Sequence, residues 1–367
     1  MNSYINSRVL RQHFYRLDLD PSFRVADETE CALIQAEAME ELFERRYAAD
    51  DNTLFTALVD CYGGKRDDSA LQEIVLGAYH FARSMVDPDG WLKGLPESYN
   101  LEEGCTFDQL PWCGILKNSL KHELENIISV QEQAVNLANK PGGAKVYLDN
   151  LEEEREMTAR LLQHCAAGAS WSDLYNTFQD ISFARLKSCR KKDADPQLAE
   201  QVRSLRDSVR KKVAAIRKEY FSRTPEGICD DLRKLYPLVK ELSSLVIDFA
   251  EAYRKAKTAR GVVDFGDLEH YSLQVLSESG AHGLIPSPEA ISLRERYEEV
   301  LVDEYQDINA VQEAILQLVS RQGDGRPNLF MVGDVKQSIY RFRLADPGLF
   351  LQKHMAYSSG RDSQGQR

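Results

Sequence analysis

Apolar residues along positions 1–260 recur at the three- and four-residue spacings that are typical of amphipathic helices. Asp27, followed three positions later by Glu30, predicts a helix N-cap at the start of one such stretch. A second stretch covers 202–220, and a third, 232–253, alternates spacings of three and four without interruption, which is a heptad pattern. Pro237 falls inside the third stretch and is expected to kink that helix or to begin its main segment. We expect the second and third stretches to form an antiparallel helical hairpin around a turn at 222–227.

The pattern changes after Gly261, where short apolar runs alternate with helical spacing. The stretch DFGDL at 264–268 predicts the start of a helix that reaches about Leu276, and a loop rich in Gly, Pro and Ser is expected up to about Pro288. A strand at 300–302, a helix at 311–319 and a strand at 329–332 should follow. Strand, helix and strand in this order predict a right-handed crossover between parallel strands. The expected fold class is therefore α/β, with most residues in helices.

Length and composition describe a globular protein. With 367 residues, two domains, or one domain with a large insertion, are expected. No apolar run reaches the length of a membrane helix, and the first residues lack the plan of a secretory signal, so no membrane association is expected. The seven cysteines include no CxxC pair, which makes a zinc site improbable and favours the reducing cytoplasm.

The net charge of −12 argues against a nucleic-acid partner, but the charge is unevenly distributed. The window 185–223 holds 13 Lys and Arg against five Asp and Glu, a net charge of +8. Such a block is usually a solvated helix face. It can also be a patch that contacts phosphates, in which case binding depends on salt.

Acidic residues follow both predicted strands. Asp303 and Glu304 end the first strand, and Gly333 and Asp334 end the second. Because parallel strands end at the same edge of a sheet, these groups should lie close together, where open sheets bind ligands. An Asp at a strand end suits Mg²⁺, and an adjacent Glu suits the activation of a water for attack on a phosphoryl group. The alternative is an ordinary acidic loop.

The segment GDVKQSIYRFR at 333–343 adds further candidate chemistry. Gln337 is a neutral polar group suited to contacting a terminal phosphate. Aromatic and guanidinium side chains then alternate, a composition that suits stacking on bases and holding a phosphodiester backbone. These four residues are Tyr340, Arg341, Phe342 and Arg343. The alternative for the two aromatic residues is a role in the core at the end of the sheet.

LVDEYQD at 301–307 and FMVGDVKQSIYRFR at 330–343 strongly resemble motifs II and III of UvrD/RecB-type superfamily 1 DNA helicases. RVLRQHFYRLDLDPSFRVAD at 8–27, DFGDLEH at 264–270 and NLFMVGDVKQSIYRFRLADPGLF at 328–350 look like the AddA family of helicase/nuclease subunits, which act in recombination and double-strand break repair. The resemblance implies an all-helical 1B-type insertion domain at 1–260, a partial RecA-like P-loop NTPase domain 1A at 261–357, and a polar tail at 358–367. It also implies ATP and Mg²⁺ as cofactors, single-stranded and duplex DNA as partners, and a second, AddB-like partner protein.

The same resemblance implies a role for individual residues. Asp303 would bind Mg²⁺ and Glu304 would be the general base for ATP hydrolysis. Gln306 and Asp307 would complete motif II and connect it to neighbouring motifs, and Gln337 would sense the γ-phosphate, with Asp334 beside it. Tyr340 and Phe342 would stack against single-stranded DNA. Arg341 and Arg343 would couple that DNA site to the nucleotide.

Three parts of the family pattern are missing from the sequence. The phosphate-binding loop GxxxxGK[ST] does not occur, because Gly64 and Lys65 are followed by Arg66. Motifs of a second RecA-like domain and of a nuclease domain are missing too. We therefore expect a piece of a longer helicase and exonuclease that does not hydrolyse ATP by itself. Two alternatives stay open: a non-catalytic DNA-binding module that uses the basic window, and a protein-interaction module that uses the heptad hairpin.

Overall fold

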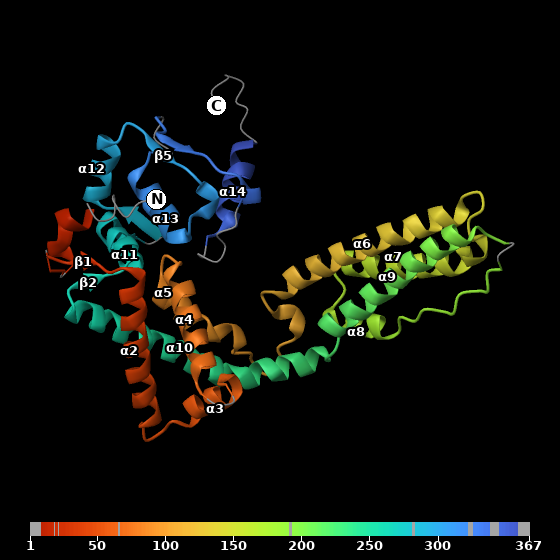
Figure 1. Ribbon diagram of the computed structural model, residues 1–367, viewed down its shortest axis with the longest axis horizontal. Coiled ribbons are helices and arrows are strands. Elements are labelled where there is room, and N and C mark those ends of the chain that lie inside the picture. Colours follow the sequence, from red (N-terminus) through yellow and green to blue (C-terminus); the bar gives the residue numbers. More distant parts are fainter. Residues whose placement is uncertain are drawn as a thin grey trace. The chain divides into compact units, whose positions relative to one another are not determined.

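The structure of the chain is a computed structural model, shown in Figure 1. It describes residues 9–17, 19–20, 22–64, 67–190, 193–280, 283–321, 326–337 and 345–358. The chain divides into two compact units, one formed by residues 1–96 and 237–367 and the other by residues 97–236. The assignment of 1–260 to a 1B-type domain and of 261–357 to domain 1A stays a prediction.

The helical part of the first unit is built around α10, the longest helix. Its elements are the 3-10 turn Phe14–Arg16, α2 (Glu28–Tyr47), α3 (Thr53–Tyr62), α4 (Ser69–Arg83), α5 (Pro88–Gly94) and the part of α10 (Pro225–Ala259) from Pro237 on. Val246, Phe249 and Tyr253 of α10 are buried against residues of α2, α3 and α4. The predicted N-cap of α2 is confirmed, because the Asp27 side chain accepts a hydrogen bond from the Glu30 N–H.

The second unit is a helical bundle to which the first part of α10, up to Tyr236, also contributes. Its elements are the 3-10 turns Phe107–Gln109 and Lys145–Tyr147 and helices α6 (Cys113–Asn139), α7 (Leu148–Ala166), α8 (Trp171–Gln179) and α9 (Pro196–Tyr220). Helix α6 packs along both α7 and α9. A further 3-10 turn, Pro96–Tyr99, lies where the chain enters this unit.

The helical hairpin expected from the two heptad stretches is wrong, although both helices form. Val209 and Val213 of α9 are buried in the core that α6, α7 and α8 share. Val246 and Phe249 of α10 are buried in a separate core with α2 to α4. The heptad spacing therefore marks helix faces that are buried in two different cores, and spacing alone does not identify the helix that a buried face contacts.

Three two-stranded sheets lie in the first unit of the described chain. The first pairs β1 (Arg24–Val25) with β2 (Val262–Val263) in parallel. The second pairs β3 (Ser277–Gly280) with β4 (Gly283–Pro286) in antiparallel orientation. The loop that was expected up to about Pro288 is thus wrong, because most of it forms this hairpin.

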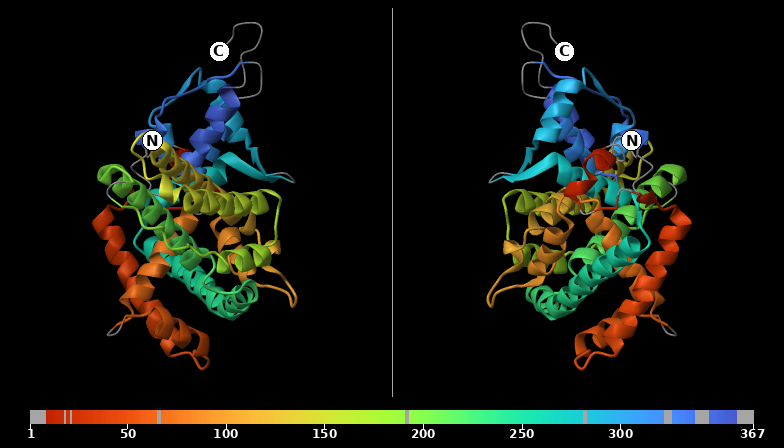
Figure 2. Two further views of the ribbon diagram at one scale, coloured as in Figure 1. Left: turned by 90° about the vertical axis from the view of Figure 1, so that its right-hand side faces the viewer. Right: turned by 90° about the vertical axis from the view of Figure 1, so that its left-hand side faces the viewer.

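The predicted βαβ crossover is confirmed. β5 (Val300–Val302) and β6 (Leu329–Met331) are parallel, with Val302 in register with Met331, and α13 (Ala310–Val319) connects them. Around them lie α11 (Phe265–Leu276), α12 (Pro288–Arg296), α14 (Pro347–Ser358) and two 3-10 turns, Tyr305–Asp307 and Val335–Gln337. Figure 2 shows these elements, in cyan to blue, from two further sides. Parallel pairing brings the carboxyl ends of β5 and β6 to one edge.

The architecture confirms the expected class, a mostly helical α/β protein. The predicted start of α11 at DFGDL is also confirmed, with a capping box in which Asp264 and Asp267 each accept from the other's backbone N–H. Among the helices that the structure describes, none has the length and apolar character that a membrane span requires.

Candidate functional site

The acidic residues after β5 lie at the edge that β6 also reaches. The Val332 N–H donates to the Val302 carbonyl at 2.9 Å, and the Tyr305 N–H donates to the Val332 carbonyl at 2.9 Å. The chain after β5 therefore turns across the end of β6 instead of leaving the sheet. This turn brings Gln306, two residues after Glu304, against Gly333.

Glu304 has a backbone conformation that is unusual for a residue with a side chain. Its φ of 52° and ψ of 46° lie in the left-handed region, and no other non-glycine residue in the described part of the chain has a positive φ. Such a conformation costs about 1–3 kcal/mol and is retained where the surroundings enforce it, often at functional sites. The Glu304 N–H donates to Asp303 Oδ1 at 3.0 Å, and the Asp307 N–H donates to the Glu304 carbonyl at 2.9 Å.

Gln306 joins the two strand ends through its side-chain amide. It is almost fully buried, and its Nε2 donates to Glu304 Oε2 at 2.6 Å. Its Oε1 accepts from the Asp334 N–H at 2.9 Å. A Cβ on Gly333 would lie 2.5 Å from that same Oε1, so any larger residue at this position would displace the amide. The amide therefore links the carboxylate after β5 to the backbone after β6.

The segment after β6 continues this network. Asp334 accepts from the Lys336 N–H through Oδ1 and from Gln337 Nε2 through Oδ2, at 3.0 and 3.1 Å. The Gln337 N–H also donates to the Asp334 carbonyl. Five sequence-predicted residues, Asp303, Glu304, Gln306, Asp334 and Gln337, are thus connected by a continuous set of hydrogen bonds. The other four, Tyr340, Arg341, Phe342 and Arg343, lie outside the described residues.

The donor set at this edge suits a magnesium ion that is held mainly by water and phosphate. Asp303 is exposed, and Glu304 has only one oxygen engaged by Gln306. In the ranges that the structure describes, no group of three or more His, Cys, Asp or Glu side chains is arranged to hold a metal. Mg²⁺ commonly takes one or two protein carboxylates together with waters and substrate phosphates, so these residues fit that ion.

Sequence reasoning did not identify the contacts that support this loop from behind. The Tyr305 hydroxyl donates to Glu313 Oε2 of α13 at 2.6 Å, and Lys353 of α14 lies 3.0 Å from Glu313 Oε1. Glu269 of α11 accepts from Gln312 Nε2 at 2.7 Å and from Asn309 Nδ2 at 3.4 Å. Asn309 and Gln312 form the capping box of α13. The NxxQ spacing was a signal for this cap, but nothing in the sequence pointed to Glu269 as its partner.

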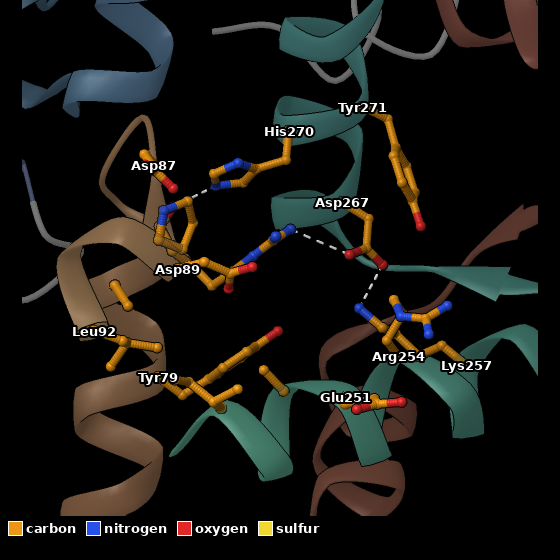
Figure 3. A pocket seen from close by; sticks show the side chains of 15 residues that line it. Tyr79, Asp87, Asp89, Leu92, Glu251, Arg254, Lys257, Asp267, His270 and Tyr271 are labelled. Carbon is orange, nitrogen blue, oxygen red and sulfur yellow. Dashed lines mark hydrogen bonds and ion pairs between the residues drawn. The ribbon is translucent and has the colours of Figure 1, made fainter. Parts of the chain in front are cut away.

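A second polar cluster anchors the N-terminal end of α11. Figure 3 shows Lys257 and Asp267 of this cluster on the wall of a cavity of about 440 Å³ that residues of α4, α5, α10 and α11 line. The Lys257 ammonium is almost fully buried and pairs with both Asp264 and Asp267, while Arg83 Nη2 lies 3.2 Å from Asp267 Oδ1. Burial raises the pKa of the Asp267 carboxyl, and the charge of Asp264 raises it further. Burial also acts to raise the pKa of Asp264. The Lys257 charge, the hydrogen bonds from Lys257 and the Asp267 N–H, and the Arg83 charge together outweigh burial, so that pKa lies below its usual value.

His270 lies beside this cluster and is held in its neutral form. Burial, together with the nearby Arg83 guanidinium, lowers its pKa to about 4. Its Nε2 lies 2.9 Å from the Arg83 carbonyl, so the neutral ring donates from Nε2 to that oxygen. The DFGDLEH stretch thus contributes anchoring groups on two sides of one helix.

Comparisons with known proteins identify the family of the chain. The chain matches the UvrD/REP helicase N-terminal domain over residues 4–358 and belongs to that helicase family. Within it, the chain is 59% identical over 98% of its length to the AddA-type ATP-dependent helicase/nuclease of Pelotomaculum thermopropionicum. The proteins of the same name from Desulforamulus reducens and Geobacillus kaustophilus are 47% and 43% identical, again over 98% of the chain.

The resemblance to UvrD-type helicases and to the AddA family is therefore confirmed. The chain spans 28% of the length of the first two relatives and 29% of the third.

Proposed function

We propose that the chain is part of an ATP-dependent DNA helicase and exonuclease that works in double-strand break repair and recombination. It carries one edge of the ATP-hydrolysis site, with Asp303 as the Mg²⁺ ligand and Glu304 as the general base. The relatives' name, ATP-dependent helicase/nuclease, and the family match support this proposal. The absence of GxxxxGK[ST] from the sequence, and the share of its relatives that the chain spans, support the view that it does not hydrolyse ATP by itself.

The observation that carries the proposal is the Gln306 bridge. Its amide holds the Glu304 carboxylate from one side and the Asp334 N–H from the other. Gln337, which is proposed to contact the γ-phosphate, is hydrogen-bonded to Asp334. Loss of the γ-phosphate at Gln337 would therefore be transmitted through a short chain of hydrogen bonds to Glu304, the proposed base, which the same hydrogen bonds position.

The chemistry follows from these placements. Bound Mg²⁺ would offset the negative charge of the phosphates during hydrolysis. The Glu304 carboxylate accepts the proton of the attacking water, and its left-handed backbone and the Gln306 N–H fix the direction of its free oxygen. Tyr340 and Phe342 would stack against bases of single-stranded DNA, with Arg341 and Arg343 between that strand and the nucleotide. Since these residues closely follow Gln337 in sequence, hydrolysis and base contact share one segment.

The partners that follow from the proposal are single-stranded and duplex DNA and a second, AddB-like protein, in the cytoplasm. A malachite-green assay with MgATP and single-stranded DNA tests it. The chain by itself should release no phosphate above background, whereas the product of a longer reading frame with an in-frame GxxxxGK[ST] should turn over and be stimulated by DNA. Robust ATP turnover by the chain alone would contradict the proposal that it carries only one edge of the ATP-hydrolysis site. A longer product that does not hydrolyse ATP would contradict the proposed helicase function.

The second candidate, a non-catalytic DNA-binding or protein-interaction module, draws on the basic window. Several of its cations are paired with acidic side chains within the described chain, which leaves fewer of them for contacts with phosphates: Lys187, Arg203, Arg206, Lys212 and Arg223. DNA binding that survives Phe342→Ala but is lost on charge reversal at Arg210, Lys211 and Lys212 would favour the binding module. No DNA binding at low salt would favour protein interaction.

A further inference from the structure

The helical unit 97–236 contains a basic cavity that the proposed ATPase role does not use. It has a volume of about 520 Å³ and lies between α9 and the extended segment that precedes it. The residues that matter for its chemistry are Phe183, Asp207, Arg210, Lys211 and Arg217. Helix α9 and the segment between α8 and α9 are visible in green and yellow-green in Figure 1.

The wall that carries Phe183 is fixed in place by two arginines of α9. Arg206 Nη2 donates to the Ala184 carbonyl at 2.6 Å, and Arg217 Nη2 donates to the Ile181 carbonyl at 2.6 Å. These bonds hold the backbone on both sides of Phe183. Arg206 itself is buried in an ion pair with Glu154, and its guanidinium carbon lies 6.0 Å from the centre of the Phe183 ring. The aromatic ring is therefore positioned before any ligand arrives.

The cavity offers cationic donors that are weakly engaged. Among the described residues, Arg210 pairs with Asp207 alone, at 3.5 Å, and both side chains are about half exposed, so this pair contributes little. Lys211 is exposed and makes no ion pair with any residue that the structure describes. Arg217 Nε is buried without an acceptor among the described residues. Arg217 also lines the cavity, so its guanidinium adds positive charge beside a bound anion.

We propose that this cavity binds one nucleotide unit of single-stranded DNA, with its phosphate at Arg210, Lys211 and Arg217 and its base against Phe183. The inference rests on the proposed function for its choice of DNA, and it adds a second contact for the strand, separate from the segment that follows Gln337. An aromatic ring beside guanidinium and ammonium groups is the arrangement that binds single strands with little sequence preference. A duplex keeps its bases stacked and would offer only its phosphates, so a single strand is preferred.

Fluorescence anisotropy with a labelled oligothymidylate and an abasic oligomer of equal length tests both parts of the cavity. Phe183→Ala should weaken oligothymidylate binding about tenfold, within the range known for a stacked base, and leave the abasic oligomer unchanged. Phe183→Leu keeps apolar packing and should show the same selective loss, and circular dichroism shows whether each variant is folded. An equal loss for both oligomers, or no loss, overturns the stacking role.

The phosphate contact is tested with adjacent lysines that are changed in the same way. Lys211→Ala should reduce the slope of log K against log salt by about 0.7, the value for one single-strand phosphate. Lys212→Ala changes the net charge equally, but this lysine pairs with Glu123 of α6, so its slope should match the wild type. Equal changes of the slope in both variants would overturn the cavity as a DNA-binding site. The proposed function would remain supported if the longer protein still showed DNA-stimulated ATP turnover. Loss of that turnover alone would count against the proposed function and not against the cavity.

Discussion

Glu269 is positioned to hold the motif II loop through the helix that follows it. Asn309 and Gln312 each use an oxygen atom for the capping box of α13, which leaves their two NH₂ groups directed at Glu269. A carboxylate has two acceptor oxygens and satisfies both groups. A glutamine at 269 has one acceptor oxygen and one donor NH₂ group. Its oxygen can therefore accept from one of the two NH₂ groups, while its own NH₂ group lies against the other without an acceptor between them.

The magnitude follows from the two distances. The bond from Gln312 at 2.7 Å is short and charge-assisted, whereas the bond from Asn309 at 3.4 Å is long and adds little. Bonds to charged groups contribute about 1.5–3 kcal/mol when buried, and Glu269 is only partly buried, so Glu269→Ala should cost about 1–2 kcal/mol. Glu269→Gln retains one neutral bond to Gln312 and should cost about 1 kcal/mol or less.

Hydrogen exchange of backbone amides is the suitable assay, because the loss is local to the start of α13. In Glu269→Ala, the amides of 304–313 should exchange about tenfold faster or more, the equivalent of about 1–2 kcal/mol. Amides of the α6–α9 bundle should be unaffected. The control is Glu295→Gln on α12, an exposed acid whose change should stay within about 0.5 kcal/mol. Unchanged exchange at 304–313 in Glu269→Ala would refute the role of Glu269 in holding the motif II loop.

Three further variants test other parts of the structure. His270→Asn should make the stability of the protein less sensitive to acid. Because the pKa of His270 in the folded protein, about 4, lies below 6.5, the wild type loses about 3 kcal/mol of stability as pH falls from 6.5 towards 4. Urea titrations in which the variant and the wild type lose equal stability over this range would contradict this. Gly333→Ala puts a Cβ 2.5 Å from Gln306 Oε1 and should lower the free energy of unfolding by about 1–3 kcal/mol; a stability equal to the wild type would show that the bridge is dispensable. Glu154→Ala leaves buried Arg206 without its carboxylate and should cost about 3–5 kcal/mol, whereas a paired replacement of both by leucine should cost much less.

Local rules in the sequence predicted local structure well. The caps at Asp27 and Asp264 and the βαβ crossover follow from short-range geometry that a few neighbouring residues determine. The edge that joins Asp303 to Asp334 followed from parallel pairing alone. The Gln306 bridge fits the connecting role that the family resemblance implied, but only coordinates identify its two partners.

Long-range packing could not be predicted in the same way. The heptads at 202–220 and 232–253 showed which faces are buried, but not that one faces α6 and the other faces α2 to α4. The cluster of Lys257 with Asp264 and Asp267 includes Arg83 from a helix far away in sequence. Hairpin pairing at 277–286 also went unrecognised, because Gly, Pro and Ser are equally common in loops and in tight turns.

The central claim is that Glu304 acts as the base in ATP hydrolysis at the edge that Gln306 connects. Single-turnover hydrolysis of ATP by the longer, DNA-stimulated protein tests it most directly, with Glu304→Gln compared with Glu299→Gln, an exposed acid just before β5. We expect Glu304→Gln to slow the chemical step by about a hundredfold or more while ATP still binds, and Glu299→Gln to have no effect. Hydrolysis by Glu304→Gln at the wild-type rate would contradict it.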